Sequence, residues 1–141
     1  MRLKIAAMAL VLATLPAAHA AQILYGINST TLITINTSTG AGTLVGNNSY
    51  GDYPFGLADY GGKLYTLNQT TDQFMELNPT TGATVTTTNI GVNVVGEGAM
   101  AFNSAGTLLF SASSGGVGSL YSSTLNGSST LISGNMADRK S

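Results

Sequence analysis

The chain has 141 residues, with 5 Lys and Arg against 6 Asp and Glu and a formal net charge of −1. So few basic residues argue against binding to nucleic acid or to anionic membrane surfaces, because both need clustered positive charge. There is no cysteine, so the fold must be held by strand pairing and packing instead of disulfide bonds.

Residues 1–20 have the pattern of a secretory signal peptide. Arg2 and Lys4 form the positive start, residues 5–15 the apolar centre, and residues 16–20 a small-residue cleavage region. The apolar run is too short for a resident membrane helix. We expect cleavage after Ala20 and a secreted product, extracellular or periplasmic, with no membrane span; a retained helix is the alternative.

Residues 55–91 are the clearest structural unit, and they predict four antiparallel strands. Gly61-Gly62 supplies the positive φ angles of a tight hairpin turn, and the Asn-Pro-Thr-Thr-Gly segment at 78–82 is a second turn. The runs between them alternate or are rich in β-branched residues, without helical spacing. The predicted strands are 56–60, 63–68, 73–77 and 83–88.

Versions of this unit stand before and after it. Residues 24–28 and 32–40 match 64–68 and 74–82, and residues 98–110 restate 56–65 with a longer turn. The period of roughly 40–45 residues, with four strands in each, is the range for propeller blades. Asn-x-Ser/Thr triplets recur with the turns and predict turn chemistry at Asn28, Asn36, Asn47, Asn68 and Asn126.

The phrases GLADYGGKLYTLN, LNPTTGATV and LYGINSTTLITINTSTGAGTLVGN resemble the propeller repeats of secreted bacterial proteins that often carry a PEP-CTERM sorting signal. The resemblance covers nearly all of the mature chain and implies blade structure but no activity. The family's sorting tail has a Pro-Glu-Pro motif, an apolar span and a basic cluster. Residues 134–141 contain none of these.

We therefore predict an all-β fold of propeller-type repeats with four-stranded antiparallel blades. The predicted parts are a signal peptide at 1–20, repeats at 21–135 (a partial blade at 21–50, blades at 55–91 and 98–135) and a polar tail at 136–141. The first unit lacks its opening strand. Just under three blades make an incomplete ring, since about four are the minimum. Two interpretations remain open: self-association into a ring, or the front part of a longer propeller with missing C-terminal blades.

Side chains with catalytic chemistry are scarce. His19 is the only histidine and lies in the expected leader, so the mature chain would have neither His nor Cys. This argues against histidine-assisted nucleophiles and the usual zinc sites. The Gly-rich run at 115–118 lacks the Lys of a phosphate cradle and is interpreted as a turn. We predict no catalytic, cofactor-binding or metal-binding residue, no cofactor and no enzyme activity.

The carboxylates of the body are predicted to be solvated loop groups. A pair for glycoside hydrolysis and a calcium site at Asp52 and Asp59 are the alternatives. Glu97 precedes a strand that would line a propeller channel, and it is the first residue to substitute if a ligand were found. The carboxylates in question are Asp52, Asp59, Asp72, Glu76 and Glu97.

The aromatic residues divide into two groups. Tyr25, Tyr65 and Phe110 occupy matching repeat positions and are predicted to lie in the core between blades. The others fall outside the matched positions and are candidates for stacking on sugar rings, although the chain has no Trp, the most useful residue for that task. They are Tyr50, Tyr53 and Tyr60.

These features together predict a non-enzymatic, secreted structural or interaction module. The alternative is a carbohydrate-binding, lectin-like propeller assembled from several copies. An extracellular hydrolase is a more distant third hypothesis. Partners would be further copies, missing blades, a carbohydrate or a protein ligand, and not nucleic acid.

Overall fold

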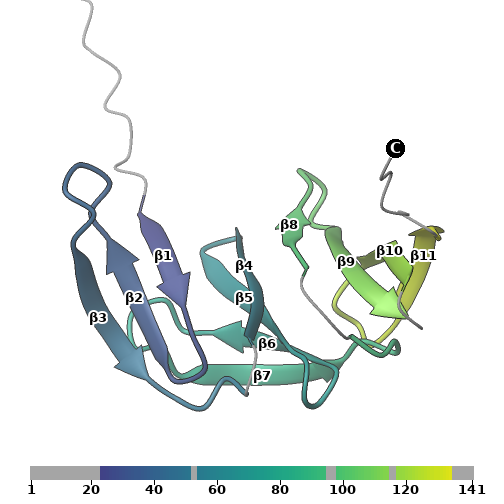
Figure 1. Cartoon of the computed structure of the whole chain (residues 1–141), viewed down its shortest axis with the longest axis horizontal. Helices are drawn as coiled ribbons and strands as arrows, with labels where there is room; N and C mark the ends of the chain where they lie inside the picture. Colours follow the sequence, from purple (N-terminus) through teal and green to yellow (C-terminus); the bar gives the residue numbers. More distant parts are fainter. Residues whose placement is uncertain (1–22, 52–53, 95–97, 115–116, 135–141) are drawn as a thin grey trace, which may run out of the picture.

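The computed structural model describes residues 23–51, 54–94, 98–114 and 117–134 (Figure 1). In these ranges eleven strands form three antiparallel sheets. The described residues contain no helix, and hence none that could cross a membrane. The expected leader and tail lie outside the described residues, as do Asp52, Tyr53, Glu97, Gly115 and Gly116.

Each sheet is a meander in which neighbouring strands follow one another along the chain. Sheet 1 has three strands, whereas sheets 2 and 3 have four each. Sheet 1 consists of β1 (Leu24–Ile27), β2 (Thr31–Ile35) and β3 (Gly42–Asn47). Sheet 2 consists of β4 (Pro54–Tyr60), β5 (Lys63–Asn68), β6 (Gln73–Leu77) and β7 (Thr84–Asn89). Sheet 3 consists of β8 (Met100–Phe102), β9 (Leu108–Ser114), β10 (Val117–Ser123) and β11 (Ser129–Ser133).

The turns use the chemistry that the sequence indicates. Gly61 and Gly62 join β4 to β5 with φ angles of 59° and 78°. The Asn78 Oδ1 atom accepts hydrogen bonds from the backbone N–H groups of Thr80 and Thr81, at 2.8 and 3.1 Å. Asparagine makes such bonds because its short side chain reaches the backbone two residues on. The same pair of bonds recurs at Asn28, Asn36 and Asn68.

Sheet 2 lies between the other two sheets, and its side chains alternate between two cores. Along β5, Leu64 packs toward sheet 1, while Tyr65 and Leu67 pack toward sheet 3. This alternation follows from the two-residue period of a strand. Thr66 is completely buried, and its hydroxyl donates a 2.8 Å hydrogen bond to the carbonyl oxygen of Gly56.

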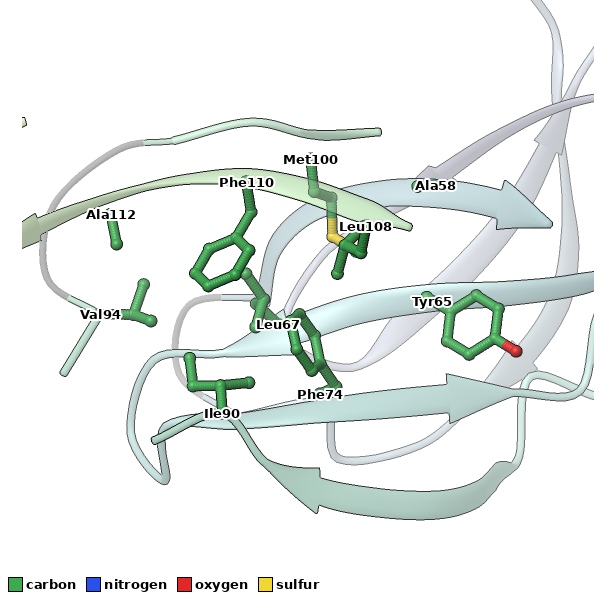
Figure 2. Packing of buried hydrophobic residues seen from close by; sticks show 10 residues of the cluster. All are labelled: Ala58, Tyr65, Leu67, Phe74, Ile90, Val94, Met100, Leu108, Phe110 and Ala112. Carbon is green, nitrogen blue, oxygen red and sulfur yellow. The ribbon is translucent and has the colours of Figure 1, made fainter. Parts of the chain in front are cut away.

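The first inter-sheet core joins sheets 1 and 2, and the second joins sheets 2 and 3. Figure 2 shows the second core, where the rings of Phe74 and Phe110 meet edge to face with centroids 5.4 Å apart. The first core is formed by Leu32, Tyr50, Leu64, Met75 and Leu77. The second is formed by Ala58, Tyr65, Leu67, Phe74, Ile90, Val94, Met100, Leu108, Phe110 and Ala112.

The sheets follow one another along an open arc (Figure 1), with β4 in contact with both β1 and β8. Successive meanders that pack face to face, with the first strands of sheets 2 and 3 adjacent, are the arrangement of propeller-type blades. The predicted all-β fold of repeated antiparallel sheets is confirmed. The three described sheets do not close a ring.

One predicted equivalence is wrong. Tyr25 and Tyr65 face the sheet that follows their own, whereas Phe110 faces the sheet that precedes it. All three nevertheless contact an inter-sheet core, as expected. The β8–β9 connection, residues 103–107, is longer than the Gly61-Gly62 turn, and a register shift of one residue moves a side chain to the opposite face of a strand.

Candidate functional site

An open groove of about 650 Å³ lies between β1 of sheet 1 and the β4–β5 hairpin of sheet 2. Its walls are mostly apolar, with charged groups from the hairpin. The lining residues are Ile23, Leu24, Tyr25, Thr37, Leu57, Ala58, Asp59, Gly62, Lys63, Leu64 and Pro79.

The groove lies where the described part of sheet 1 has one strand fewer than sheet 2. β5 pairs with β4 on one side and with β6 on the other, but its repeat counterpart β1 pairs only with β2 among the described strands. The edge of β1 is therefore open at the place where sheet 2 carries its first strand. Unpaired backbone N–H and C=O groups at such an edge can hydrogen-bond another strand.

Some of the polar groups around the groove already make hydrogen bonds or ion pairs within the protein. The Tyr25 hydroxyl donates a 3.4 Å hydrogen bond to the Pro79 carbonyl oxygen. Lys63 Nζ lies 3.0 Å from Glu76 Oε1 and donates a 3.1 Å hydrogen bond to Oε2. That bond, with the negative charge of Glu76, raises the pKa of Lys63. Asp59 is exposed to solvent.

The three predicted carboxylates that lie in the described ranges, Asp59, Asp72 and Glu76, do not share one site. Asp72 has a structural role: its Oδ1 atom accepts a 2.8 Å hydrogen bond from the Val94 N–H, and its own φ is 52°. Glu76 is paired with Lys63, and Asp59 lines the groove. Within the described ranges no three His, Cys, Asp or Glu side chains come together as a metal site would require.

The expectation that Tyr50 is available for sugar stacking is wrong. Tyr50 is fully buried in the first inter-sheet core, and its hydroxyl donates a 2.6 Å hydrogen bond to the Gly82 carbonyl oxygen. Burial raises the pKa of this hydroxyl. Tyr60 is 40% exposed, and its ring stacks on Phe102 with centroids 5.2 Å apart.

No protein-family model matches the chain, and no curated protein is detectably similar in sequence. The PQQ-bound aldose sugar dehydrogenase of Streptomyces coelicolor is similar in structure, with a TM-score of 0.47 and 15% identity over 86% of this chain and 37% of that one. BamB of Moraxella catarrhalis has a TM-score of 0.40 and 16% identity over 80% of this chain and 33% of its own. The chain thus spans about a third of the length of either protein, and neither likeness assigns a role to a residue.

Proposed function

We propose that this chain is a secreted, non-enzymatic interaction module that binds other polypeptides through the open surfaces of its sheets. One observation carries the proposal: sheet 1 exposes repeat positions that sheet 2 buries. Leu64 of sheet 2 is 4% exposed, whereas its counterpart Leu24 in sheet 1 is 49% exposed. When an apolar side chain is buried in one repeat but exposed to solvent at the matching position of another, the exposed surface is suited to binding a partner.

The outward face of sheet 1 is apolar over several strands. Strand alternation places Leu24, Ile33 and Ile35 on the face opposite Tyr25. A Cβ atom added at Gly26 would lie 3.2 Å from both Ile33 and Ile35, which shows that these side chains share one face. This outward face therefore has the composition of the sheet 2 face that packs in the first inter-sheet core.

A second copy of the chain is the proposed partner for this face. In sheet 3, at the other end of the arc, Ile132 of β11 is 52% exposed. Packing of sheet 3 of one copy on sheet 1 of the next would continue the face-to-face stacking that already occurs twice within the chain. Such a head-to-tail contact produces a ring if the rotation closes.

The test is the native mass of the secreted protein, measured by light scattering over a range of concentrations. We expect discrete oligomers, and we expect Leu44→Lys to reduce them, because Leu44 is a 57% exposed residue of β3. Val85→Lys is the matched control, since Val85 is 54% exposed on β7 of the central sheet. A monomer at every concentration, or equal loss in both variants, would contradict this mode of association.

The absence of His and Cys from residues 21–141 supports a non-enzymatic role. A broad glycosidase and esterase screen tests it, and we expect no turnover. If activity were found, Glu97→Gln would be the first substitution to examine. Activity unchanged by that substitution would remove Glu97 from consideration, and any confirmed activity would end the non-enzymatic proposal.

Carbohydrate binding is the second candidate function, and one observation favours it. Tyr60 presents a partly exposed ring that Phe102 supports from behind, at 5.2 Å and an interplanar angle of 25°. A rigid aromatic face of this kind suits a sugar ring. On a glycan array we would expect binding that Tyr60→Ala abolishes; the lack of any bound glycan would retire this candidate.

A further inference from the structure

We propose that the open edge of β1 binds an extended segment of a partner polypeptide as an added antiparallel strand. The segment would be uncharged over most of its length, with small and apolar residues facing the groove beside β1. This inference rests on the proposed interaction role and specifies the site and the chemistry of the partner. The outward face of sheet 1 is the surface proposed for a second copy; Leu24 borders both surfaces, whereas Leu44 lies on that face and outside the groove.

The repeat defines where the strand would lie. β4 pairs with β5 so that Ala58 is opposite Tyr65 and Asp59 is opposite Leu64. In β1 the residues matching Leu64 and Tyr65 are Leu24 and Tyr25. In an added strand, the residue equivalent to Ala58 would thus lie opposite Tyr25, and the residue equivalent to Asp59 would lie opposite Leu24.

The neighbouring interface shows how the added strand would pack. Between sheets 2 and 3 the first strands are in close contact, and a Cβ atom added at Gly56 of β4 would lie 2.8 Å from the Met100 side chain of β8. Between sheets 1 and 2 the corresponding space is the groove, with Leu57 and Ala58 of β4 in its wall. A strand paired with β1 would fill this groove and contact β4, in the same way that β4 contacts β8 in the next interface.

The groove has the size and character of a binding site. Its volume of about 650 Å³ falls within the range of roughly 300–1,000 Å³ that is typical of ligand pockets. Leu57, Leu64 and Tyr25 give it apolar walls, and Asp59 and Lys63 supply one charge of each sign. A neutral segment with apolar side chains therefore suits it better than a strongly charged one.

The sequence of β1 leaves this edge unprotected. Edge strands usually avoid further pairing by carrying charged residues or Pro. The four residues of β1, Leu-Tyr-Gly-Ile, include neither. Main-chain hydrogen bonds would supply affinity, and the alternate side chains in the groove would supply selectivity, as in other cases of strand addition.

A peptide with the sequence of residues 54–60 (PFGLADY), blocked at both ends and labelled, is the probe. Its binding to the secreted protein is measured by fluorescence anisotropy, with a scrambled peptide as the first control. Leu24→Lys is the test variant, because Leu24 lines the groove and is exposed enough to be replaced without unfolding the protein. Leu44→Lys is the matched control, since Leu44 is an exposed leucine of the same sheet outside the groove.

We expect saturable binding of the peptide, at least tenfold weaker binding to the Leu24→Lys variant, unchanged binding to Leu44→Lys, and slower amide hydrogen exchange in β1 on binding. No saturable binding to folded wild type, equal affinity for the Leu24→Lys variant, or slowed exchange only in β11 would each overturn the proposal. Protection of β1 without peptide that disappears on dilution would assign the edge to a second copy instead. The native-mass experiment tests the proposed function separately, because it responds to Leu44.

Discussion

Sheets 1 and 2 are built from matching residues but differ in what covers them. Sheet 2 is covered on both faces and pairs β5 on both sides, so Leu64 and Met75 are each 4% exposed. In sheet 1 the counterparts Leu24 and Ile33 are open or half-buried. Burial in this chain is therefore decided by the neighbouring sheet more than by the residue itself.

The largest predicted difference separates Leu64→Ala from Leu24→Ala. Leu64→Ala should lower the free energy of unfolding by about 2–5 kcal/mol, because it leaves a cavity in the first inter-sheet core. Leu24→Ala should cost less than about 0.5 kcal/mol in the monomer, as expected for an exposed position. Urea unfolding of both variants measures this. Equal losses would mean that the two sheets are covered alike.

Gly46→Ala tests how closely sheet 1 approaches the β6–β7 turn. A Cβ atom at Gly46 would collide with the backbone carbonyl oxygen of Thr81. Since a backbone oxygen cannot move aside as a side chain can, we expect a loss of about 1–3 kcal/mol in thermal or urea unfolding. Gly134→Ala is the control, because its nearest neighbour would be 3.9 Å away. An unchanged stability for Gly46→Ala would contradict the close contact.

Tyr50→Phe removes the hydroxyl that joins the end of sheet 1 to Gly82. The Gly82 carbonyl oxygen would lose a buried hydrogen bond of 2.6 Å, which we expect to cost about 1–3 kcal/mol. Urea unfolding at neutral pH measures the loss. Wild-type stability in this variant would show that water reaches the carbonyl, and hence that the first inter-sheet core is open at this end.

The smallest effect is expected from alkaline pH. Burial raises the pKa values of Tyr50 and Tyr65, and the bond to Glu76 raises the pKa of Lys63. Because the folded state favours the protonated form of each group, their contributions are complete below about pH 10 and are lost as pH rises through the raised values. Urea midpoints should therefore stay constant up to about pH 10 and fall as the pH is raised further. A midpoint that rises as the pH is raised above this value would refute the assignment.

Much of the fold can be predicted from the sequence because turn residues mark the ends of the strands. The Gly61-Gly62 and Asn78 turns, and the two faces of β5, follow from local chemistry. The burial of Tyr50 could not be predicted, since it lies beyond the end of β3, outside the alternating pattern of a strand. The face of sheet 3 on which the Phe110 side chain lies depends on the length of the β8–β9 connection, which the sequence match did not define.

The candidate site was less predictable. The repeat predicts that sheet 1 lacks the counterpart of β4, as it does among the described strands. The groove also depends on how β4 packs toward sheet 1. Asp59 and Lys63 come to its rim through the tight hairpin turn that joins their strands. The spacing of Asp59 and Lys63 in the sequence does not by itself show that they line the same groove.

Amide hydrogen exchange of β1 and β5 in dilute, peptide-free protein tests most directly whether β1 has an open edge that β5 lacks. Among the described strands β5 pairs on both sides and β1 on one, so the amides of residues 64–68 should be protected throughout. In residues 24–27 protected amides should alternate with rapidly exchanging ones. Uniformly slow exchange in both strands of the monomer would contradict an open edge at β1.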